Sequence, residues 1–532
     1  MAENINNKTH LHVFGTISKI HLFNCIETIL VKLSKKMPTA ASITFIAYFI
    51  VLLGIGFFFY RRSSNIEDYL LGGRGMGSWV TALSAQASDM SAWLLMGLPG
   101  AIYLGGMGKT WIATGLFIGT VLNWKLVSAR LRVYTEKTSA ITLPCFFEAR
   151  FRDPTGLLRV VSAIIILIFF AIYASSGLVA TGKLFESTFN VQYHLAVIIG
   201  GLVIIAYTFL GGFLAVCWTD LLQGALMVFA IVIVPLLTYK TAGGVSAIKE
   251  AMAIKDISTS LIPQGATLPV CICMIISSMA WGLGYFGQPH ILVRFMSIKS
   301  ADKLGKSMAI AVIWVFLSLC GAVIIGLIGI AMFDDLSGGE EEKVFIFMIS
   351  KLFNPWFGGI LLAAIFSAIM STIDSQLLVS SSALSEDFYC KAIRKEASER
   401  EIVLVGRGCV VIISIIALIM ALDRDNTILE IVSYAWGGFG AAFGPLVLFA
   451  LFSRKTTWQS ALAGMVTGTV VLVLWKQVGL SDSMYEIVPG FIANCLTIFL
   501  INIFLSQKDG EILKEFDDVQ KQIRSVHTNT AI

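Results

Sequence analysis

The stretch GSWVTALSAQASDMSAWLLMGLPGAIYLGG, residues 77–106, decides the fold of this chain. It is apolar over a length that can cross a bilayer, yet it holds Asp89 near its middle, followed by Gly97, Pro99 and Gly100. Gly costs about 1 kcal/mol and Pro about 3 kcal/mol inside a helix, so the helix should break here. An Asp at the centre of a membrane helix costs about 2.5–3.5 kcal/mol, so it should persist only if it is paired or functional. The stretch predicts an interrupted membrane helix with a polar centre.

The composition of the whole chain is typical of a polytopic membrane protein. Of 532 residues, 56% are hydrophobic and only 14% are charged, whereas a soluble domain has about 25% charged residues. These values exclude a soluble globular protein, a disordered chain, a collagen-like chain and a secreted disulfide scaffold. The net charge of +5 suggests no nucleic-acid partner, and the nine Cys and six His show no disulfide or zinc spacing.

Thirteen apolar runs are long enough to cross a bilayer, which needs about 20 residues per helix. They predict an all-α integral membrane protein with short loops. The runs cover residues 39–60, 77–103, 110–129, 158–182, 193–211, 215–239, 268–291, 307–332, 356–385, 402–421, 427–451, 457–476 and 487–506.

The distribution of Lys and Arg predicts the orientation. If the N-terminus lies outside, the inner loops and the C-terminal tail hold 23 of these residues and the outer loops hold nine. The positive-inside rule therefore favours an outer N-terminus and a cytoplasmic C-terminus. The five Lys of residues 1–38 oppose this orientation. Either this extension is an amphipathic surface helix, or translation starts at Met37, which is the interpretation we favour.

The C-terminal tail, residues 507–532, is charged but has apolar residues at helical spacing. It is either a short amphipathic cytoplasmic helix or, as we favour, a solvated tail without a specific partner. The apolar positions are Ile512, Leu513, Phe516, Val519 and Ile523.

A second apolar run is interrupted like the first. It reads VCICMIISSMAWGLGYFGQPHILVRF, residues 270–295, and has three Gly and one Pro within eight residues. Each interrupted run opens a block of five spans, and because five is odd the two blocks are inverted. Paired interruptions in inverted halves indicate a secondary transporter whose substrate and ion bind where the breaks meet. The alternative is that the glycines only allow close helix packing.

Carboxylates and hydroxyls within the spans are candidate ion ligands. Ser371 and Thr372 share a helix face with the carbonyl of Ala368, and such a weakly charged oxygen cage suits a hard monovalent ion such as sodium. The alternative for these hydroxyls is hydrogen bonding within their own helix, and for Asp89 it is a structural hydrogen bond to a neighbouring span. Asp220 and Asp374 are either a second ion site or charge partners of Arg or Lys.

At these positions the chain resembles the solute:sodium symporter family, and within it the bacterial sodium/proline symporters. The resemblance covers about residues 45–505. It is carried by EDYLLGGRGMGSWVTALSAQASDMSAWLLMGLPGA (67–101), GGFLAVCWTDLLQGALM (211–227), WGLGYFGQPHILVRFM (281–296), STIDSQLLVSSSALSEDFY (371–389) and VSYAWGGFGAAFGPLVLF (432–449).

The resemblance implies a five-plus-five inverted-repeat core of the LeuT type, with one extra span before it and two after it. The implied divisions are an extension (1–38), a first span and inner loop (39–76), the first repeat (77–239), an outer loop (240–267), the second repeat (268–451), two added spans (452–506) and the cytoplasmic tail (507–532).

The resemblance also implies a set of site residues. The sodium ligands are the carbonyls of Ala87, Met90 and Ala368 and the hydroxyls of Ser371 and Thr372, and Asp89 matches an aspartate tied to sodium dependence. Proline contacts fall on Ser91, Trp93, Gly97, Tyr173, Trp281, Tyr285 and Pro289. Asp220, Asp374 and Ser375 resemble a second ion position, and Arg74 an arginine of the inner face. Ala92 stands where relatives often have Gly.

The sequence thus predicts a plasma-membrane (bacterial inner-membrane) importer that couples L-proline to Na⁺ and is not an enzyme. Its expected partners are L-proline and membrane lipid, with no nucleic acid and no obligate protein partner. One alternative is the same fold importing another amino acid, betaine, pantothenate or a sugar. The other is a membrane sensor that binds solute without transport.

Overall fold

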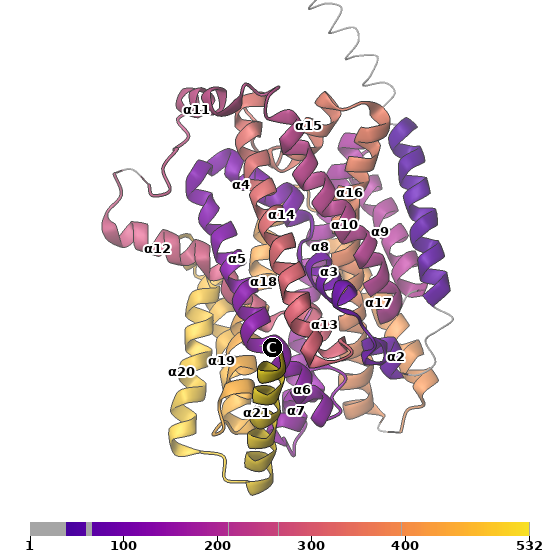
Figure 1. The fold of residues 1–532 in the computed structure, drawn as a ribbon, viewed down its shortest axis with the longest axis vertical. Helices are drawn as coiled ribbons and strands as arrows, with labels where there is room; N and C mark the ends of the chain where they lie inside the picture. Colours follow the sequence, from indigo (N-terminus) through magenta and orange to yellow (C-terminus); the bar gives the residue numbers. More distant parts are fainter. Residues whose placement is uncertain (1–38, 60–65, 211, 264, 395, 531–532) are drawn as a thin grey trace, which may run out of the picture.

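The computed structural model describes residues 39–59, 66–210, 212–263, 265–394 and 396–530. These ranges are helical and contain no β-strand; a single isolated bridge pairs Met76 with Ile298. Most helices run along the long axis of the molecule (Figure 1). One end carries α11 (Gly244–Ile254) and the other carries α21 (Gly510–Thr530). We call them the α11 end and the α21 end. The predicted extension 1–38 lies outside the described residues.

Eleven helical segments of the described residues are long and apolar enough to cross a membrane. Two of the thirteen runs are not separate segments here: the first interrupted run joins the next one, and the run 193–211 is represented by a shorter apolar stretch, Tyr193–Ala206, within the described residues. The first interrupted run has only the 12 residues of α3 (Ser78–Asp89) before its break, and its second half continues into the next run. The eleven segments are Thr39–Phe59, Trp93–Lys137, Leu157–Phe189, Phe213–Thr238, Leu268–Gly287, Ala301–Met332, Pro355–Lys391, Glu401–Met420, Ile428–Phe452, Trp458–Gln477 and Ile487–Phe504.

Two sets of helices follow each other in the same order. The first set begins with the broken helix α3, η2 (Trp93–Gly97) and α4 (Leu98–Gly105), and the second with α12 (Leu268–Met279), η5 (Ala280–Gly287) and α13 (Pro289–Ser297). The rest of the first set is α5 (Thr110–Asn123), η4 (Trp124–Ser128), α6 (Ala129–Lys137), α7 (Leu143–Phe151), α8 (Leu157–Phe189), α9 (Tyr193–Leu210) and α10 (Phe213–Thr238). The rest of the second is α14 (Leu304–Met332), α15 (Val344–Leu352), α16 (Pro355–Ser382), η8 (Ala383–Ile393), α17 (Glu399–Met420) and α18 (Ile428–Phe452). The helices α19 (Trp458–Gln477) and α20 (Ile487–Phe504) follow.

The two breaks lie inside the bundle, surrounded by the longer helices. α3 packs against α10, α14 and α16, and η5 packs between α5 and α18. The contact of η5 with α5 is backbone on backbone, because a Cβ at Gly282 would overlap the carbonyl oxygen of Gly115. The glycines of the second break therefore serve close packing as well as interruption.

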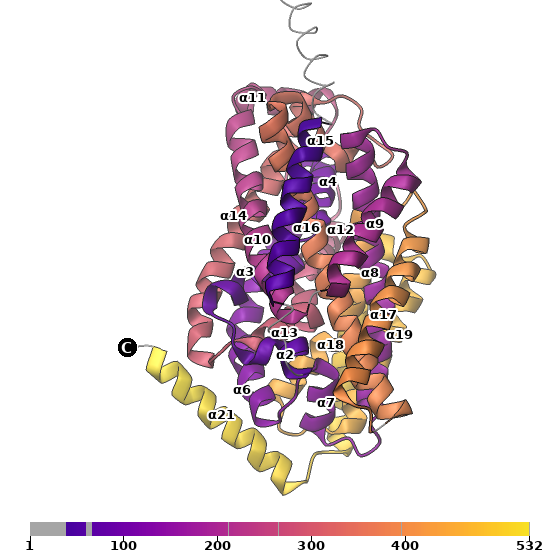
Figure 2. The ribbon, with the colours of Figure 1, turned by 90° about the vertical axis from the view of Figure 1, so that its right-hand side faces the viewer.

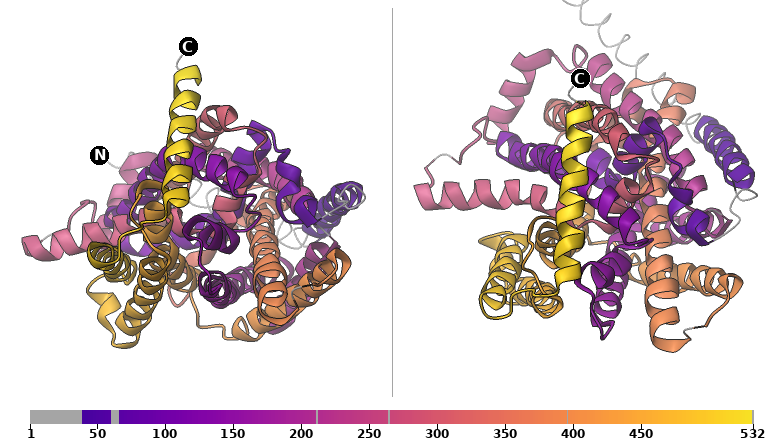
Figure 3. Two further views of the ribbon diagram at one scale, coloured as in Figure 1. Left: turned by 90° about the horizontal axis from the view of Figure 1, so that it is seen from below. Right: turned by 60° about the horizontal axis from the view of Figure 1, so that its bottom comes forward.

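The helix α12 leaves the bundle sideways. In Figures 1 and 3 it runs across the direction of α5 and α14 and projects from the body. Its apolar side chains are exposed, including Leu268 at 73% and Val270 at 54%. The predicted span 268–291 overlaps the apolar segment Leu268–Gly287, in which α12 projects from the body while η5 packs between α5 and α18; α13 then continues among the other helices.

The C-terminal helix α21 packs across one end of the bundle (Figures 2 and 3). It buries Ile512, Phe516, Val519 and Ile523, four of the five apolar positions that the sequence places at helical spacing. Surface ion pairs flank the buried stripe: Arg152 with Glu511, Lys137 with Asp518 and Arg454 with Asp517. The favoured prediction of a solvated tail is wrong, because the apolar face of the helix finds a matching surface on α6 and its neighbours.

Candidate functional site

The first helix break lies just past Asp89. α3 ends there, and Met90 has non-helical backbone angles of φ −81° and ψ 77°. The Ser91 hydroxyl accepts from the backbone N–H of Trp93 at 3.4 Å, and the indole Nε1 of Trp93 donates to the carbonyl of Asp89 at 3.1 Å. The side chains after the break thus satisfy part of the backbone that the break frees, as membrane burial requires.

The second break is a stretch of 3-10 helix followed by one extended residue, Gln288. The side-chain amide Nε2 of Gln288 donates to the carbonyl of Trp436 at 3.2 Å, and the indole of Trp436 donates to the carbonyl of Trp281 at 2.7 Å. Gly284 lies directly against the Trp436 indole, where any Cβ would overlap it. Trp436 of α18 therefore contacts the second break through hydrogen bonds and through packing on Gly284.

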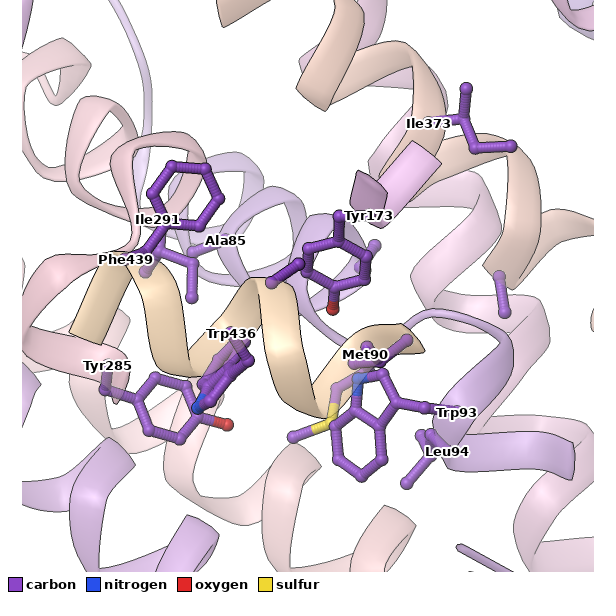
Figure 4. Close-up of a cluster of buried hydrophobic side chains, with 14 of the residues drawn as sticks. Ala85, Met90, Trp93, Leu94, Tyr173, Tyr285, Ile291, Ile373, Trp436 and Phe439 are labelled. Carbon is purple, nitrogen blue, oxygen red and sulfur yellow. The ribbon is translucent and has the colours of Figure 1, made fainter. Parts of the chain in front are cut away.

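A buried hydrogen bond joins the two breaks. The Tyr285 hydroxyl donates to Oδ2 of Asp89 at 2.7 Å, and neither side chain is more than 1% exposed. Figure 4 shows Tyr285 beside Trp436, with Met90 and Trp93 nearby. Oδ1 of Asp89 has no hydrogen-bond partner among the described residues. Asp89 thus makes the hydrogen bond to a neighbouring span that the sequence leaves as its alternative role.

Four oxygen atoms converge between α3 and α16. The Ser371 hydroxyl donates to the carbonyl of Ala87 at 2.7 Å and lies 3.3 Å from the carbonyl of Ala368. The Thr372 hydroxyl lies 3.4 Å and 3.2 Å from the same two carbonyls. All four residues are at most 2% exposed. Two carbonyls and two hydroxyls are the donor set expected for a weakly charged site for a hard monovalent cation, so these residues fit sodium.

Aromatic side chains surround the breaks. The ring centroids of Trp93 and Trp281 are 6.3 Å apart, and those of Trp281 and Tyr485 are 5.6 Å apart. Tyr285 meets Trp436 edge to face at 5.1 Å. The hydroxyl of Tyr173 is buried without a hydrogen-bond partner among the described residues, and Figure 4 shows the ring close to Met90.

The residues that the sequence predicts to contact the substrate lie in different parts of the site. Ser91 and Trp93 lie at the first break, and Pro289 begins α13 and lines a small cavity on the side of the α21 end. Gly97 faces Leu429, where a Cβ would meet the leucine side chain at 3.4 Å. Met90 is fully buried at the break, and Ala92 is buried beside it.

Sequence reasoning missed two aromatic residues of the site. Trp436 stands in one of the motifs that carry the resemblance, so the signal for it was present in the sequence. Tyr485 follows the second set of helices, and only its packing on Trp281 and its hydroxyl bond to the Ser433 carbonyl at 2.6 Å reveal it.

A buried polar network lies on the side of the site nearer the α21 end. The guanidinium of Arg294 contacts Asp220 Oδ2 at 3.3 Å, Ser375 Oγ at 2.5 Å and Ser84 Oγ at 3.1 Å. Asp374 directly precedes Ser375 in the chain and is also buried. Both of its carboxylate oxygens are without hydrogen-bond partners among the described residues. Arg294 follows the predicted span 268–291 and is one of the 23 Lys and Arg counted on the inner side, so the sequence places it in an inner loop. This is wrong, because α13 extends to Ser297 and buries the side chain completely.

A buried ion pair lies on the side of the site nearer the α11 end. Lys183 Nζ and Glu342 Oε2 are 2.6 Å apart, and their side chains are 5% and 4% exposed. Oε1 of Glu342 accepts from the backbone N–H of Leu429 at 3.2 Å. Burial raises the pKa of the Glu342 carboxyl, and Lys183 opposes that shift. The backbone of Glu342 also lies against Gly100 of α4, where a Cβ would have its nearest atoms at 3.1 Å. The pair therefore ties α8, the segment before α15 and the start of α18 above the first break.

The model of the sodium:solute symporter family matches residues 69–468, more than half of the chain. The chain belongs to the sodium:solute symporter family. The matched range includes both breaks, the oxygen cluster and the Arg294 network of this symporter.

Curated relatives are similar over nearly their whole length. The symporter is 48% identical over 474 residues to a sodium/proline symporter of Salmonella typhimurium, which covers 88% of this chain and 93% of that protein. It is 47% identical over 472 residues to the high-affinity proline transporter PutP of Bacillus subtilis, which covers 88% of this chain and 99% of that protein.

Solved structures show the same fold at low identity. A Na⁺-coupled sialic acid symporter in a substrate-bound outward-open state superimposes with a TM-score of 0.73 at 18% identity, over 88% of this chain and 99% of that one. MhsT in complex with L-phenylalanine superimposes with a TM-score of 0.51 at 14% identity, over 80% and 97%. The symporter therefore has the LeuT-type fold that its sequence predicts.

Proposed function

We propose that this symporter imports L-proline together with sodium by alternating access across a plasma membrane. The observation that carries the proposal is the meeting of the two breaks beside the oxygen cluster of Ala87, Ala368, Ser371 and Thr372. The substrate assignment is supported by relatives at 47–48% identity that are named for proline. The termini follow from the charge distribution: the α21 end lies in the cytoplasm and the N-terminus outside.

The oxygen cluster supplies the sodium site. Sodium between the carbonyls of Ala87 and Ala368 would join α3 to α16, and the hydroxyls of Ser371 and Thr372 would turn their lone pairs toward it. Ala87 is two residues before Asp89, whose carboxylate holds Tyr285 in the second break. Sodium binding would therefore fix both breaks at once, with Asp89 as a positioning residue. Fixing the breaks in this way raises the affinity for proline. Because the coupling between the two ligands is reciprocal, bound proline must raise sodium affinity by the same factor.

The aromatic residues form a pocket of suitable chemistry for proline. Proline is a compact zwitterion with an apolar ring, and Trp93 and Trp281 offer faces that can cover the ring and lie near its cationic amine. The buried hydroxyl of Tyr173 has no described partner and is a candidate donor to the carboxylate. Helix N-termini freed at the breaks favour the same anionic group.

For Asp220 the contacts favour the role of charge partner. Its Oδ2 and the Ser375 hydroxyl both bind the guanidinium of Arg294, which is the arginine partner that the sequence leaves as its alternative role. We assign Asp220 and Ser375 to this structural network, with Asp374 as the remaining candidate carboxylate. The apolar outer faces of the spans contact lipid, and we propose no obligate protein partner.

Uptake of labelled L-proline into proteoliposomes tests the proposal. An inward gradient of sodium, choline or protons is imposed, and accumulation above equilibrium is expected with sodium alone. Equal accumulation driven by protons would overturn the ion assignment. Absence of uptake with any ion from folded protein would overturn the substrate, and competition by other amino acids, betaine, pantothenate or sugars would identify its replacement.

A further inference from the structure

A small cavity lies next to the candidate site, on the side of the α21 end. Pro289 and Val293 of α13 form one wall, and Thr142, Pro144, Ser382 and Asp387 contribute to the others. Its volume is about 20 Å³, room for about one particle of the size of a water molecule. Pro289 is also the first residue after the second break, so the cavity begins where the site ends.

The cavity wall contains one buried carboxylate with a free oxygen. Asp387 is fully buried. Its Oδ1 accepts from the Thr142 hydroxyl at 2.8 Å and from Arg159 Nε at 2.7 Å. Its Oδ2 has no hydrogen-bond partner among the described residues. A buried carboxylate oxygen left unsatisfied costs free energy, so such an atom indicates a missing positive or donor group.

The charges around Asp387 do not cancel. Arg159 contacts the carboxylates of Asp387, Glu386 and Glu148 at 2.7, 3.0 and 3.3 Å. Lys391 pairs with Glu148. These five groups carry three negative and two positive charges, so one negative charge remains. Asp387, whose Oδ2 has no hydrogen-bond partner among the described residues, is the member of this group that lines the cavity.

The cavity is connected to the oxygen cluster by one continuous helical segment. α16 carries Ser371 of the cluster and continues directly into η8, which carries Asp387. Ser375 and Ser382 follow Ser371 after 4 and 11 residues. At 100° per residue these three hydroxyls share one face, and Ser382 lies about 16 Å along the axis from Ser371. A polar edge thus runs from the cluster to the cavity.

We propose that this cavity is a transient binding site for the coupling ion on its way to the α21 end, with Oδ2 of Asp387 as its charged ligand. This inference rests on the proposed function. We assign the ion as sodium because the polar edge that ends at Ser382 in the cavity wall starts at Ser371 of the oxygen cluster. The ammonium of proline has the same charge, and a second series of measurements separates the two. Sodium present at the α21 end occupies this site and opposes release of the transported ion.

The test uses right-side-out membrane vesicles loaded with a series of sodium concentrations, with external sodium constant. The initial rate of labelled L-proline uptake gives the internal sodium concentration that halves transport. In Asp387→Asn this concentration should rise about tenfold, the change that about 1.4 kcal/mol produces. The external sodium concentration for half-maximal uptake should stay within about twofold, the change that about 0.4 kcal/mol produces.

Glu386→Gln is the matched control. Glu386 also pairs with Arg159, but it is partly exposed and does not line the cavity. The control should keep the internal sodium dependence of the wild type. An equal shift in both variants would show that Asp387 only holds Arg159, and an unchanged Asp387→Asn would remove the site. If Asp387→Asn does not insert, Ser382→Ala replaces it, and an unchanged internal sodium dependence there would also overturn the proposal.

A second series replaces internal sodium with internal L-proline. If Asp387→Asn shifts the internal proline dependence and leaves the sodium dependence unchanged, the substrate ammonium is the ligand and the sodium assignment is wrong. The two proposals fail differently. Sodium-driven uptake by the wild type with unaltered variants overturns only the cavity site, whereas absence of sodium-driven uptake in the wild type overturns the proposed function and this site with it.

Discussion

The hydrogen bond between Asp89 and Tyr285 gives the sharpest prediction. Asp89→Asn keeps the size of the side chain but replaces a charged acceptor of a 2.7 Å bond by a neutral one. Hydrogen bonds to charged groups contribute about 1.5–3 kcal/mol and neutral ones about 0.5–1.5 kcal/mol. The loss is therefore about 1–1.5 kcal/mol, or about fivefold to tenfold in an equilibrium constant.

This loss should be seen in the sodium dependence of uptake. The bond fixes the end of α3 two residues beyond Ala87, whose carbonyl belongs to the oxygen cluster. Asp89→Asn should therefore raise the sodium concentration for half-maximal proline uptake by about fivefold to tenfold, with the protein still inserted. Ser88→Ala is the control, because that hydroxyl donates only to Ala85 within its own helix; it should leave the sodium dependence within about twofold.

A double-mutant cycle with Tyr285→Phe decides whether the bond is the cause. Sodium titrations of proline uptake in proteoliposomes are compared for the wild type, both single variants and the double variant. If the two residues act through one bond, the double variant should be no worse than the more affected single variant. Multiplied effects of the two substitutions, or normal sodium stimulation of Asp89→Asn, would refute the reasoning.

Three further perturbations follow from the contacts. Trp281→Ala should raise the half-saturating proline concentration at least about tenfold, since removing a buried aromatic wall costs about 1.5–3 kcal/mol; an unchanged value in uptake kinetics would remove it from the pocket. Lys183→Met should destabilise the protein by about 3–5 kcal/mol by leaving Glu342 buried and unpaired. Because burial raises the pKa of Glu342, protonation relieves that cost at low pH, so thermal unfolding should show a larger loss at pH 8 than at pH 5; a larger loss at pH 5 would contradict it. Val519→Asp should detach α21, because Val519 is fully buried, and limited proteolysis should then cut the tail; an uncut tail would show that the surface ion pairs alone hold it.

Local chemistry made both helix breaks predictable. The Gly and Pro residues near Asp89 and Trp281 disfavour a continuous helix wherever they fold, so their positions could be read from the chain. The cluster of Ala368, Ser371 and Thr372 was predictable for the same reason, because helical spacing alone puts two hydroxyls near one carbonyl.

Contacts between distant segments were not predictable in this way. Asp89 was expected to be paired or functional, but its partner Tyr285 is 196 positions away. Arg294 was placed in a loop because hydropathy ends the span before it, although Asp220, Ser84 and Ser375 satisfy its guanidinium inside the protein. The thirteen apolar runs likewise report hydrophobicity and not where a helix joins, bends or leaves the bundle.

The sequence by itself determined that this chain crosses a membrane many times and that two of its helices break. It also predicted that hydroxyl and carbonyl oxygens suited to a hard cation share one face of the helix that carries Ser371 and Thr372. These properties depend on residue type and short-range spacing, because hydrophobic length, backbone propensity and helical period act within one or a few turns. Only the tertiary structure decided which groups meet: Asp89 with Tyr285, Arg294 with Asp220, and α21 with the end of the bundle. Those pairings depend on how helices far apart in the chain pack, since a buried polar group is satisfied by whichever partner the packing brings within hydrogen-bond distance.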